Sequence, residues 1–410
     1  MGNSRTVRPS AAAILLCAGI SGLFPITSNA ADAGFLKWIR DFQPVAAKSG
    51  ISAQTYRAVF AGIDEPDPEV LEAARFQPEF TAKVWEYMDS RITPSIIRRG
   101  RELVGEYKPW LDRIEANFGV DRHIVVAIWS MESSYGEALQ KKTGIRSVAR
   151  SLGTLAYADP KRAKFARSQL IAAMKIVQAG DVSPSGLTGS WAGAMGHTQF
   201  IPTSYLAWAV DIDGDKHRNV WTSPPDALAS SANLLRKNGW QTGKTWGYEV
   251  KLPSGFDFGL EDKDGITLAR WEQLGVRRIG GGAFARPQDK AVLKLPAGAS
   301  GPAFLMIKNF YVIKRYNNAD KYALAVGLLA DELAGHGGLV KDWPRGYVPM
   351  SEEERMEAQT ILKRLGHYDD EIDGKFGPAS RKAIIDFQQR SGMEPDGFPS
   401  KKLLARLRSS

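Results

Sequence analysis

The sequence has a single cysteine, Cys17, among its 410 residues. It lies in an apolar stretch near the start of the chain, so residues 18–410 can form neither disulfides nor thiolate sites. The five histidines are scattered and leave no zinc-binding set. The sequence also contains no HExxH, GxSxG, P-loop or GxGxxG pattern. These absences exclude the common zinc-protease, serine-hydrolase, nucleoside-triphosphatase and dinucleotide-binding chemistries.

The start of the chain has the pattern of a secretory signal peptide. Arg5 and Arg8 precede the apolar run AAAILLCAGISGLF, and small residues end at Ala30. Because the run is shorter than the roughly 20 residues that span a bilayer, we expect cleavage and assign residues 1–30 to the signal peptide. Leu16 stands before Cys17, where a lipoprotein signal needs a small residue, so we expect export without a lipid anchor.

Length and charge bound the remaining chain. A chain of this length is too long for one ordinary hydrophobic core, so we expect two or three domains. The formal net charge is +9, and it falls to +7 without Arg5 and Arg8. Residues 351–410 balance eleven basic against eleven acidic residues, so the positive excess lies in 31–350. An anionic polymer suits such a body, whereas nucleic acid fits an exported chain poorly and no motif for it is present.

The hydrophobic pattern predicts a mainly helical, α+β body. Residues 35–117 carry apolar residues at three-to-four spacing in stretches closed by glycine, which indicates helices. Another helix is expected over 121–136, with Asp121 as its N-cap and Gly136 as its stop. From about 245 to 312, short segments rich in valine, isoleucine and aromatics lie between turns, which predicts a small β-rich insertion. One of these segments is AFLMIKNFYVIKRY, residues 303–316.

The end of the chain forms a unit of its own. Residues 341–350 are expected to be a linker, and 351–410 to fold as three short amphipathic helices. Two turn phrases in this tail, DGKFG and DGFPS, echo each other. Sixty residues are enough for a small helical module.

One carboxylate, Glu132, stands in the apolar run VVAIWSMESSYG. On a helix, Ile128 lies one turn before it and Tyr135 just after it, so the carboxyl would look from an apolar wall into a cleft. Such surroundings keep a proton on a carboxyl near neutral pH, as a general acid for glycosidic cleavage requires. The alternative is a glutamate that is merely exposed at a helix end.

Two further stretches combine aromatic and amide groups suited to sugars. In GSWAGAMGHTQFIPTSY, small residues allow close approach of a ligand, and Ser190 and Gln199 could bind its polar groups. In KRYNNADKYALAV, Tyr316, Asn317 and Tyr322 could line a carbohydrate cleft. A packed loop and core tyrosines are the respective alternatives.

An acidic loop has some of the spacing of a calcium site. Its aspartates alternate like positions 1, 3 and 5 of a calcium loop, and a later aspartate could replace the missing glutamate at position 12. Lys216 stands where such loops carry glycine. A solvated acidic turn is the alternative. The candidate ligands are Asp211, Asp213, Asp215, His217 and Asp226.

Together, these stretches resemble the membrane-bound lytic murein transglycosylase B family, whose members cleave bacterial peptidoglycan. The resemblance covers roughly residues 33–340 and rests on the MES helix, GAMGHTQFIPTSY followed by DIDGD, and RYN with a later tyrosine. The tail resembles a type 1 peptidoglycan-binding domain through DGKFGPASRKAIIDFQ. The resemblance implies a lysozyme-like catalytic core over 31–340, with a helical domain, the small β-rich insertion and a C-terminal three-helix peptidoglycan-binding module.

The same resemblance implies the chemistry. Glu132 would be the single acid/base that cleaves the MurNAc–GlcNAc β-1,4 bond and leaves 1,6-anhydromuramic ends. It implies no required cofactor, a structural calcium ion at the acidic loop, and a periplasmic monomer that meets glycan strands and cell-wall synthesis machinery. A hydrolytic muramidase, a non-catalytic wall-binding scaffold and a calcium-responsive binding protein stay as alternatives. The implied substrate-cleft residues are Tyr87, Arg162, Ser190, Gln199, Tyr316, Asn317 and Tyr322.

Overall fold

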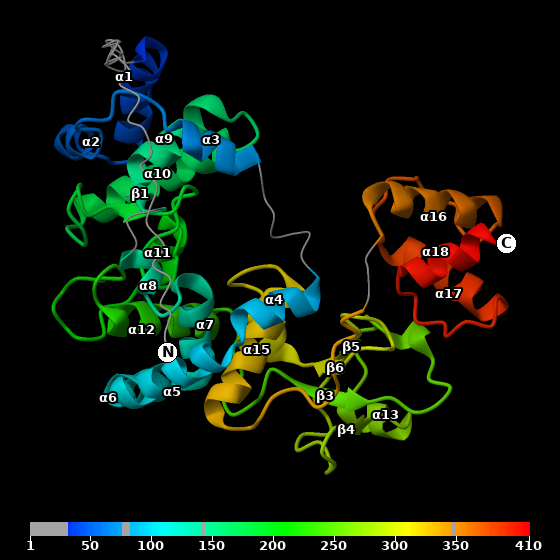
Figure 1. The fold of residues 1–410 in the computed structure, drawn as a ribbon. Helices are drawn as coiled ribbons and strands as arrows, with labels where there is room; N and C mark the ends of the chain where they lie inside the picture. The colour runs from blue at the N-terminus through cyan, green and yellow to red at the C-terminus, as the bar shows by residue number, and fades with distance from the viewer. Residues whose placement is uncertain (1–31, 76–82, 141–143, 347–349) are drawn as a thin grey trace, which may run out of the picture.

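The structure is a computed structural model that describes residues 32–75, 83–140, 144–346 and 350–410. The expected signal peptide, residues 1–30, lies outside these ranges. The described chain is mainly helical with small sheets, which confirms the predicted fold class (Figure 1). In these ranges, no helix combines the length and the apolar character that crossing a bilayer would require.

The first group of helices gathers the N-terminal segment and two helices from the middle of the chain. Their contacts place them side by side at one end of the molecule (Figure 1). Their apolar faces join one large hydrophobic core that continues into the rest of the body. The group comprises α1 (Ala33–Lys48), α2 (Ala53–Val59), α3 (Pro68–Arg75), α9 (Val148–Ala158) and α10 (Ala163–Gln178).

The second group surrounds one buried helix, α7, which packs closely along α15. Nine of the twelve residues of α7 are buried, so this helix lies at the centre of the large core. The group comprises α4 (Val84–Arg91), α5 (Pro94–Glu106), α6 (Lys108–Phe118), α7 (Arg122–Ser133), α8 (Glu137–Gln140), α11 (Pro202–Trp208), α12 (Pro224–Lys237) and α15 (Asp320–Ala334).

The ends of α7 agree with the prediction at one terminus only. Asp121 is the N-cap, as predicted, and its side chain accepts the His123 N–H. The helix ends at Ser133, three residues before the predicted stop at Gly136. Ser134 and Tyr135 take φ values of 50° and 60°, so the left-handed turn starts on residues that rarely adopt it.

The β-rich insertion lies where the sequence predicted it and has its own core. Its antiparallel sheet has the strand order β4-β3-β6-β5, with Gly247 opposite Met306 and Val250 opposite Ala303. The strands are β3 (Gly247–Lys251), β4 (Arg277–Arg278), β5 (Val292–Lys294) and β6 (Ala303–Met306), with η2 (Phe258–Leu260) and α13 (Leu268–Gln273) between them.

One part of the insertion differs from the prediction. Residues 303–316 were expected to be β-rich, but only β6 is extended and α14 (Lys308–Ile313) follows it. The buried Asn309 side chain bonds the backbone of Gln241 and Lys244, which holds this helix in place. A short apolar run of this kind does not distinguish a buried strand from a buried helix.

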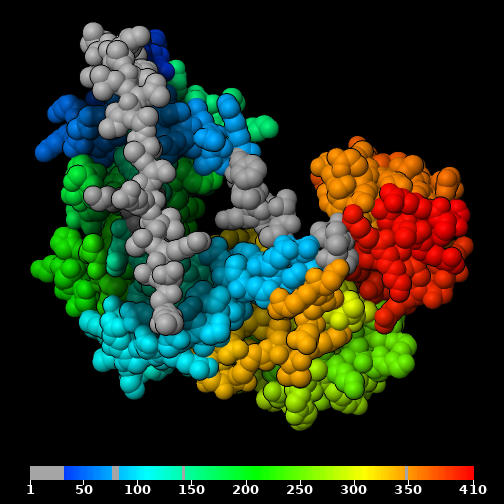
Figure 2. Space-filling model, viewed as in Figure 1, coloured from blue at the N-terminus to red at the C-terminus, as the bar shows by residue number. Residues whose placement is uncertain are grey.

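The C-terminal module is a bundle of three helices, as predicted, around a separate small core. It lies beside the insertion and across an open space from the N-terminal helices (Figures 1 and 2). Its helices are α16 (Glu352–Arg364), α17 (Pro378–Arg390) and α18 (Lys401–Arg408).

Candidate active site

Glu132 is the penultimate residue of α7, and its side chain is half-buried. It lines a cavity of about 540 Å³ together with Ser190 and Gln199. A two-residue ladder between β1 (Arg146–Ser147) and β2 (Thr188–Gly189) precedes the loop that carries both of these residues. The fold thus brings the two predicted polar groups to the predicted acid.

A tyrosine from α15 fixes the carboxylate. The Tyr322 hydroxyl donates a hydrogen bond of 2.6 Å to Oε1 of Glu132. Burial, followed by the charge of Glu132, raises the pKa of Tyr322 well above its ordinary value. The phenol therefore keeps its proton at neutral pH and acts as a donor to the acid.

A second tyrosine connects α15 to the loop of Gln199. The Tyr316 hydroxyl donates to the carbonyl oxygen of Thr198 at 2.6 Å and lies 3.1 Å from the Ser231 hydroxyl. Its ring stacks on that of Tyr322, with centroids 6.5 Å apart. Burial, and then the charge of Glu132, raises the pKa of Tyr316 as well. The Tyr316 phenol therefore also stays protonated. Its hydrogen bond to Thr198 holds the loop of Gln199 against the stacked rings of Tyr316 and Tyr322.

The amide of Gln199 is held by its own loop. Gln199 has φ of 50°, and its Nε2 donates to the carbonyl oxygen of Gly196 at 2.9 Å. Gly196 has φ of 68°, and a Cβ there would lie 2.2 Å from the carbonyl oxygen of Val220. Only glycine permits this close approach to the Val220 carbonyl. The approach fixes the loop and therefore the place where the amide of Gln199 enters the cavity.

Helix α7 holds the same loop through contacts that the sequence did not indicate. The Trp129 indole N–H donates to Nδ1 of His197 at 3.1 Å, and the Ser133 hydroxyl donates to the His197 carbonyl oxygen at 2.6 Å. Burial lowers the pKa of His197 to about 4, so its imidazole is neutral and can accept. Helix α7 therefore carries the acid Glu132 and also holds the loop that carries the amide of Gln199.

A second acid, Asp181, also lines the cavity and was missed from the sequence. Its carboxylate accepts the Arg218 backbone N–H at 3.1 Å and pairs with the guanidinium of Arg218 at 2.6 Å. Only 6% of the Asp181 side chain is exposed. In the described part of the cavity wall, the second acid is thus held by an arginine.

Five of the seven predicted cleft residues lie outside this cavity wall, and two of them are the tyrosines Tyr316 and Tyr322 described above. The other three have different surroundings. Tyr87 on α4 lies under the Lys321 ammonium, whose nitrogen is 5.3 Å from the centroid of the Tyr87 ring. Asn317 is exposed between α14 and α15. Arg162 pairs with Asp159 at 2.8 Å just before α10.

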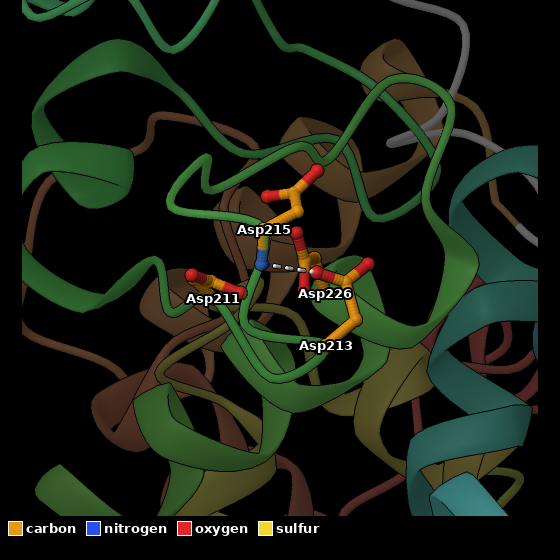
Figure 3. Close-up of side chains that lie close together, drawn as sticks. All are labelled: Asp211, Asp213, Asp215 and Asp226. Carbon is orange, nitrogen blue, oxygen red and sulfur yellow. Dashed lines mark hydrogen bonds between the residues drawn. The ribbon is translucent and has the colours of Figure 1, made fainter.

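The acidic loop gathers four of its five predicted ligands. Carboxylate oxygens of Asp211, Asp213, Asp215 and Asp226 all lie within 4.8 Å of one another (Figure 3). Asp226 is fully buried, and its two oxygens accept the Ile212 and Asn219 N–H groups at 2.9 Å each. The fifth predicted ligand, His217, is not part of this cluster of side-chain oxygens.

The donor set of this loop fits a hard divalent cation. Burial, with smaller effects from the charges of Asp213 and Asp211, raises the pKa of Asp226 to about 6. Lys216, the departure from glycine, takes φ of 75° and donates its N–H to Asp211 at 2.8 Å. Its side chain is exposed. The lysine therefore makes the left-handed turn that glycine usually supplies.

Comparison with known families assigns both parts of the chain. A model of the transglycosylase SLT domain matches residues 34–331, and a model of the peptidoglycan binding domain matches residues 351–407. The first range contains Glu132 and the acidic loop. The second range coincides with the three-helix module.

Relatives of known structure or function have the same architecture. Residues of this chain are 31% identical over 255 positions to membrane-bound lytic murein transglycosylase B of Escherichia coli K12, a match that spans 60% of this chain and 66% of that protein. The structure of SltB3 from Pseudomonas aeruginosa in complex with NAG-anhNAM-pentapeptide is 46% identical, with a TM-score of 0.84, covering 92% of this chain and 100% of that one. Escherichia coli Slt35 in complex with calcium is 26% identical, with a TM-score of 0.59, covering 74% and 94%.

Replacing Gly196 with alanine should destabilise the chain more than the same change at Gly180. Both glycines have positive φ, which costs an alanine about 1–2 kcal/mol. A Cβ at Gly180 meets nothing within 4 Å, whereas at Gly196 it meets the Val220 carbonyl. We expect Gly196→Ala to lose a further 1–3 kcal/mol or so in urea unfolding. Equal losses for both variants would contradict the close approach.

Proposed function

The chain belongs to the transglycosylase SLT family, and we propose that it is a lytic murein transglycosylase. Its substrate would be the MurNAc–GlcNAc β-1,4 bond of peptidoglycan, and its product would carry a 1,6-anhydromuramic end. The proposal rests on one observation above all. A half-buried Glu132, bonded by a protonated Tyr322, shares its cavity with the amide of Gln199.

Glu132 would act first as the acid and then as the base. In its protonated form it donates to the glycosidic oxygen, and the bond to C1 of muramic acid breaks. The carboxylate then removes a proton from the muramic 6-hydroxyl, whose oxygen attacks C1 and closes the anhydro ring. No water is consumed. The Tyr322 hydroxyl on Oε1 stabilises the carboxylate between these two proton transfers.

The state of Asp181 supports this route over hydrolysis. Glycoside hydrolases normally use a second carboxylate about 5 Å or 6.5–9.5 Å from the acid. The second acid of the cavity wall is paired with Arg218, so it is poorly placed to serve as nucleophile or base. The N-acetyl group of the substrate would then stabilise the positive charge at C1.

The remaining site residues would bind the glycan. Gln199 presents its amide oxygen to the cavity while its Nε2 bonds Gly196. The Ser190 hydroxyl accepts the Ala194 N–H at 3.1 Å and so shapes the cavity wall. The rings of Tyr316 and Tyr322 stack on each other outside the cavity wall, with Tyr322 bonded to Glu132. Asn317 follows Tyr316 in the chain, and Tyr87 contacts Lys321, the residue before Tyr322. Arg162 has no contact that supports this role.

The cellular setting follows from the same proposal. Export through the predicted signal peptide 1–30 would place the enzyme in the periplasm, where its glycan substrate lies. Residues 31–340 would form the catalytic region, 341–350 the linker and 351–410 the wall-binding module, which would raise the local concentration of the enzyme on the polymer. The enzyme would act as a monomer during wall remodelling or turnover, in contact with wall-synthesis machinery.

Replacing Glu132 with glutamine should abolish turnover and spare binding. A neutral amide cannot transfer a proton. It has nearly the shape of the carboxyl group, and its oxygen can still accept the Tyr322 hydrogen bond. Mass spectrometry of digested sacculi measures the product, because anhydro ends weigh one water less than the reducing ends of a hydrolase. Soluble muropeptides released by Glu132→Gln would rule out the assignment, and reducing ends from the wild type would favour a muramidase.

Replacing Tyr322 with phenylalanine should lower kcat by roughly 10²-fold, as loss of one donor to a developing charge does. KM should change little, because the ring still stacks on Tyr316. The exposed Tyr157, at 38% exposure, gives a matched control for the same substitution. Wild-type kcat in Tyr322→Phe, measured on soluble glycans, would remove this hydroxyl from the mechanism.

The acidic loop would bind a structural calcium ion through its four aspartates. Calcium at 100 times its Kd should then stabilise the fold by about 2.7 kcal/mol. A protonated Asp226 opposes binding, so the gain in melting temperature should be larger at pH 7.5 than at pH 5, below its pKa of about 6. Asp213→Asn should lose the gain, whereas Asp264→Asn, exposed elsewhere, should keep it. No shift in the wild type would contradict the site.

A further inference from the structure

The C-terminal module is attached to the insertion by a largely buried ion pair. Arg381 of α17 pairs with Glu261, whose side chain is 10% exposed. The same guanidinium donates to the carbonyl oxygens of Phe258 at 3.2 Å and Asp396 at 3.0 Å. The other oxygen of Glu261 accepts the Leu295 N–H at 2.8 Å. One arginine therefore joins α17, a turn of the module and two segments of the insertion.

A turn of the module completes this contact. The Asp396 carboxylate accepts the Ala299 backbone N–H at 3.1 Å. Gly298 has φ of 68°, and a Cβ there would lie 2.8 Å from both Asp396 and Phe398. The module thus packs directly against the backbone of the insertion at Gly298. A side chain at this position would prevent the contact.

The echoing turns of the sequence explain which surface docks. Gln359 accepts the N–H groups of Asp373 and Gly374, and Gln388 accepts that of Gly397. Gly374 and Gly397 both have φ of 68°. The two turns are therefore built alike, each held by a buried glutamine of the preceding helix. In the described contacts, only the second turn bonds the insertion, through Asp396.

The segment between body and module is fixed at the same place. The Lys341 ammonium donates to the carbonyl oxygen of Ala299 at 2.8 Å, so the backbone of this one residue bonds both linker and module. Trp343 is buried and packs 6.4 Å from Phe304 of β6. Glu249 of β3 accepts the N–H groups of Val340 and Lys341. The start of the linker is thus part of the docked surface.

We propose that Arg381 and Glu261 are positioning residues, which hold the wall-binding module at one fixed place relative to the Glu132 cavity. The proposal rests on the proposed function, since it makes wall binding and cleavage act at a set spacing. A module held in one orientation presents bound glycan to the cavity more often than one on a free tether. Without Arg381, the buried Glu261 loses the cation that it bonds, and without the Glu261 charge, the Arg381 guanidinium loses its anion. Either change weakens the contact.

A distance measurement tests the docking itself. In the full chain with Cys17→Ser, spin labels are placed at the exposed positions of Ala116→Cys on α6 and Gln389→Cys on α17. We expect one narrow distance distribution, which broadens in Arg381→Ala and in the shape-conserving Glu261→Gln. Arg408→Ala, which breaks the exposed pair with Glu357 inside the module, should leave it narrow. A narrow, unshifted distribution in both interface variants would overturn the proposal.

An activity measurement tests the consequence. We expect Arg381→Ala to lower turnover of intact sacculi roughly tenfold and to leave kcat on short soluble glycans unchanged. Arg408→Ala should change neither. Equal activity on sacculi, or equal losses on both substrates, would overturn the positioning role. If the wild type itself released no anhydro products, the proposed function would fail, while the spin-label distances would still report whether the module is docked.

Discussion

The hydrogen bond from Tyr322 to Glu132 joins the first turn of α15 to the last turn of α7, and the candidate site depends on it. These two helices pack along each other through the large core, so the carboxylate and the phenol are placed by the same packing. Tyr316 extends the arrangement to Thr198, next to Gln199. The Tyr316–Tyr322 pair and the neutral imidazole of His197 therefore hold segments that are distant in sequence around the Glu132 carboxylate.

The local pattern was sufficient to pick out the residues that the fold brings together at the candidate site. Glu132, Ser190 and Gln199 do share one cavity, and Tyr322 does meet Glu132. The reason is that each lies in a stretch whose composition is unusual for its surroundings. A carboxylate in an apolar helix and glycines in an aromatic loop are both visible without any knowledge of the fold.

The partners that neutralise or orient these groups were not visible. Asp181 meets Arg218, and Trp129 meets His197, across separations that no local spacing encodes. Arg162 stays a prediction, and its partner in the structure is the local residue Asp159. The α14 helix was missed since its buried residues have the composition of a strand. Long-range pairing and tertiary packing thus account for most of what the sequence did not indicate.

The path of the backbone from the docked loop to the tyrosines has a mechanical consequence. β6 begins four residues after Ala299, continues into α14 and leads to Tyr316 and then Tyr322. Packed interiors are stiff and transmit strain. If the module were bound to a wall stretched by turgor, the tensile load would enter the insertion at Ala299. It would then be transmitted along the backbone from Ala299 to Tyr322. Tyr322, which bonds Glu132, thus lies at the far end of the segment that would bear this load.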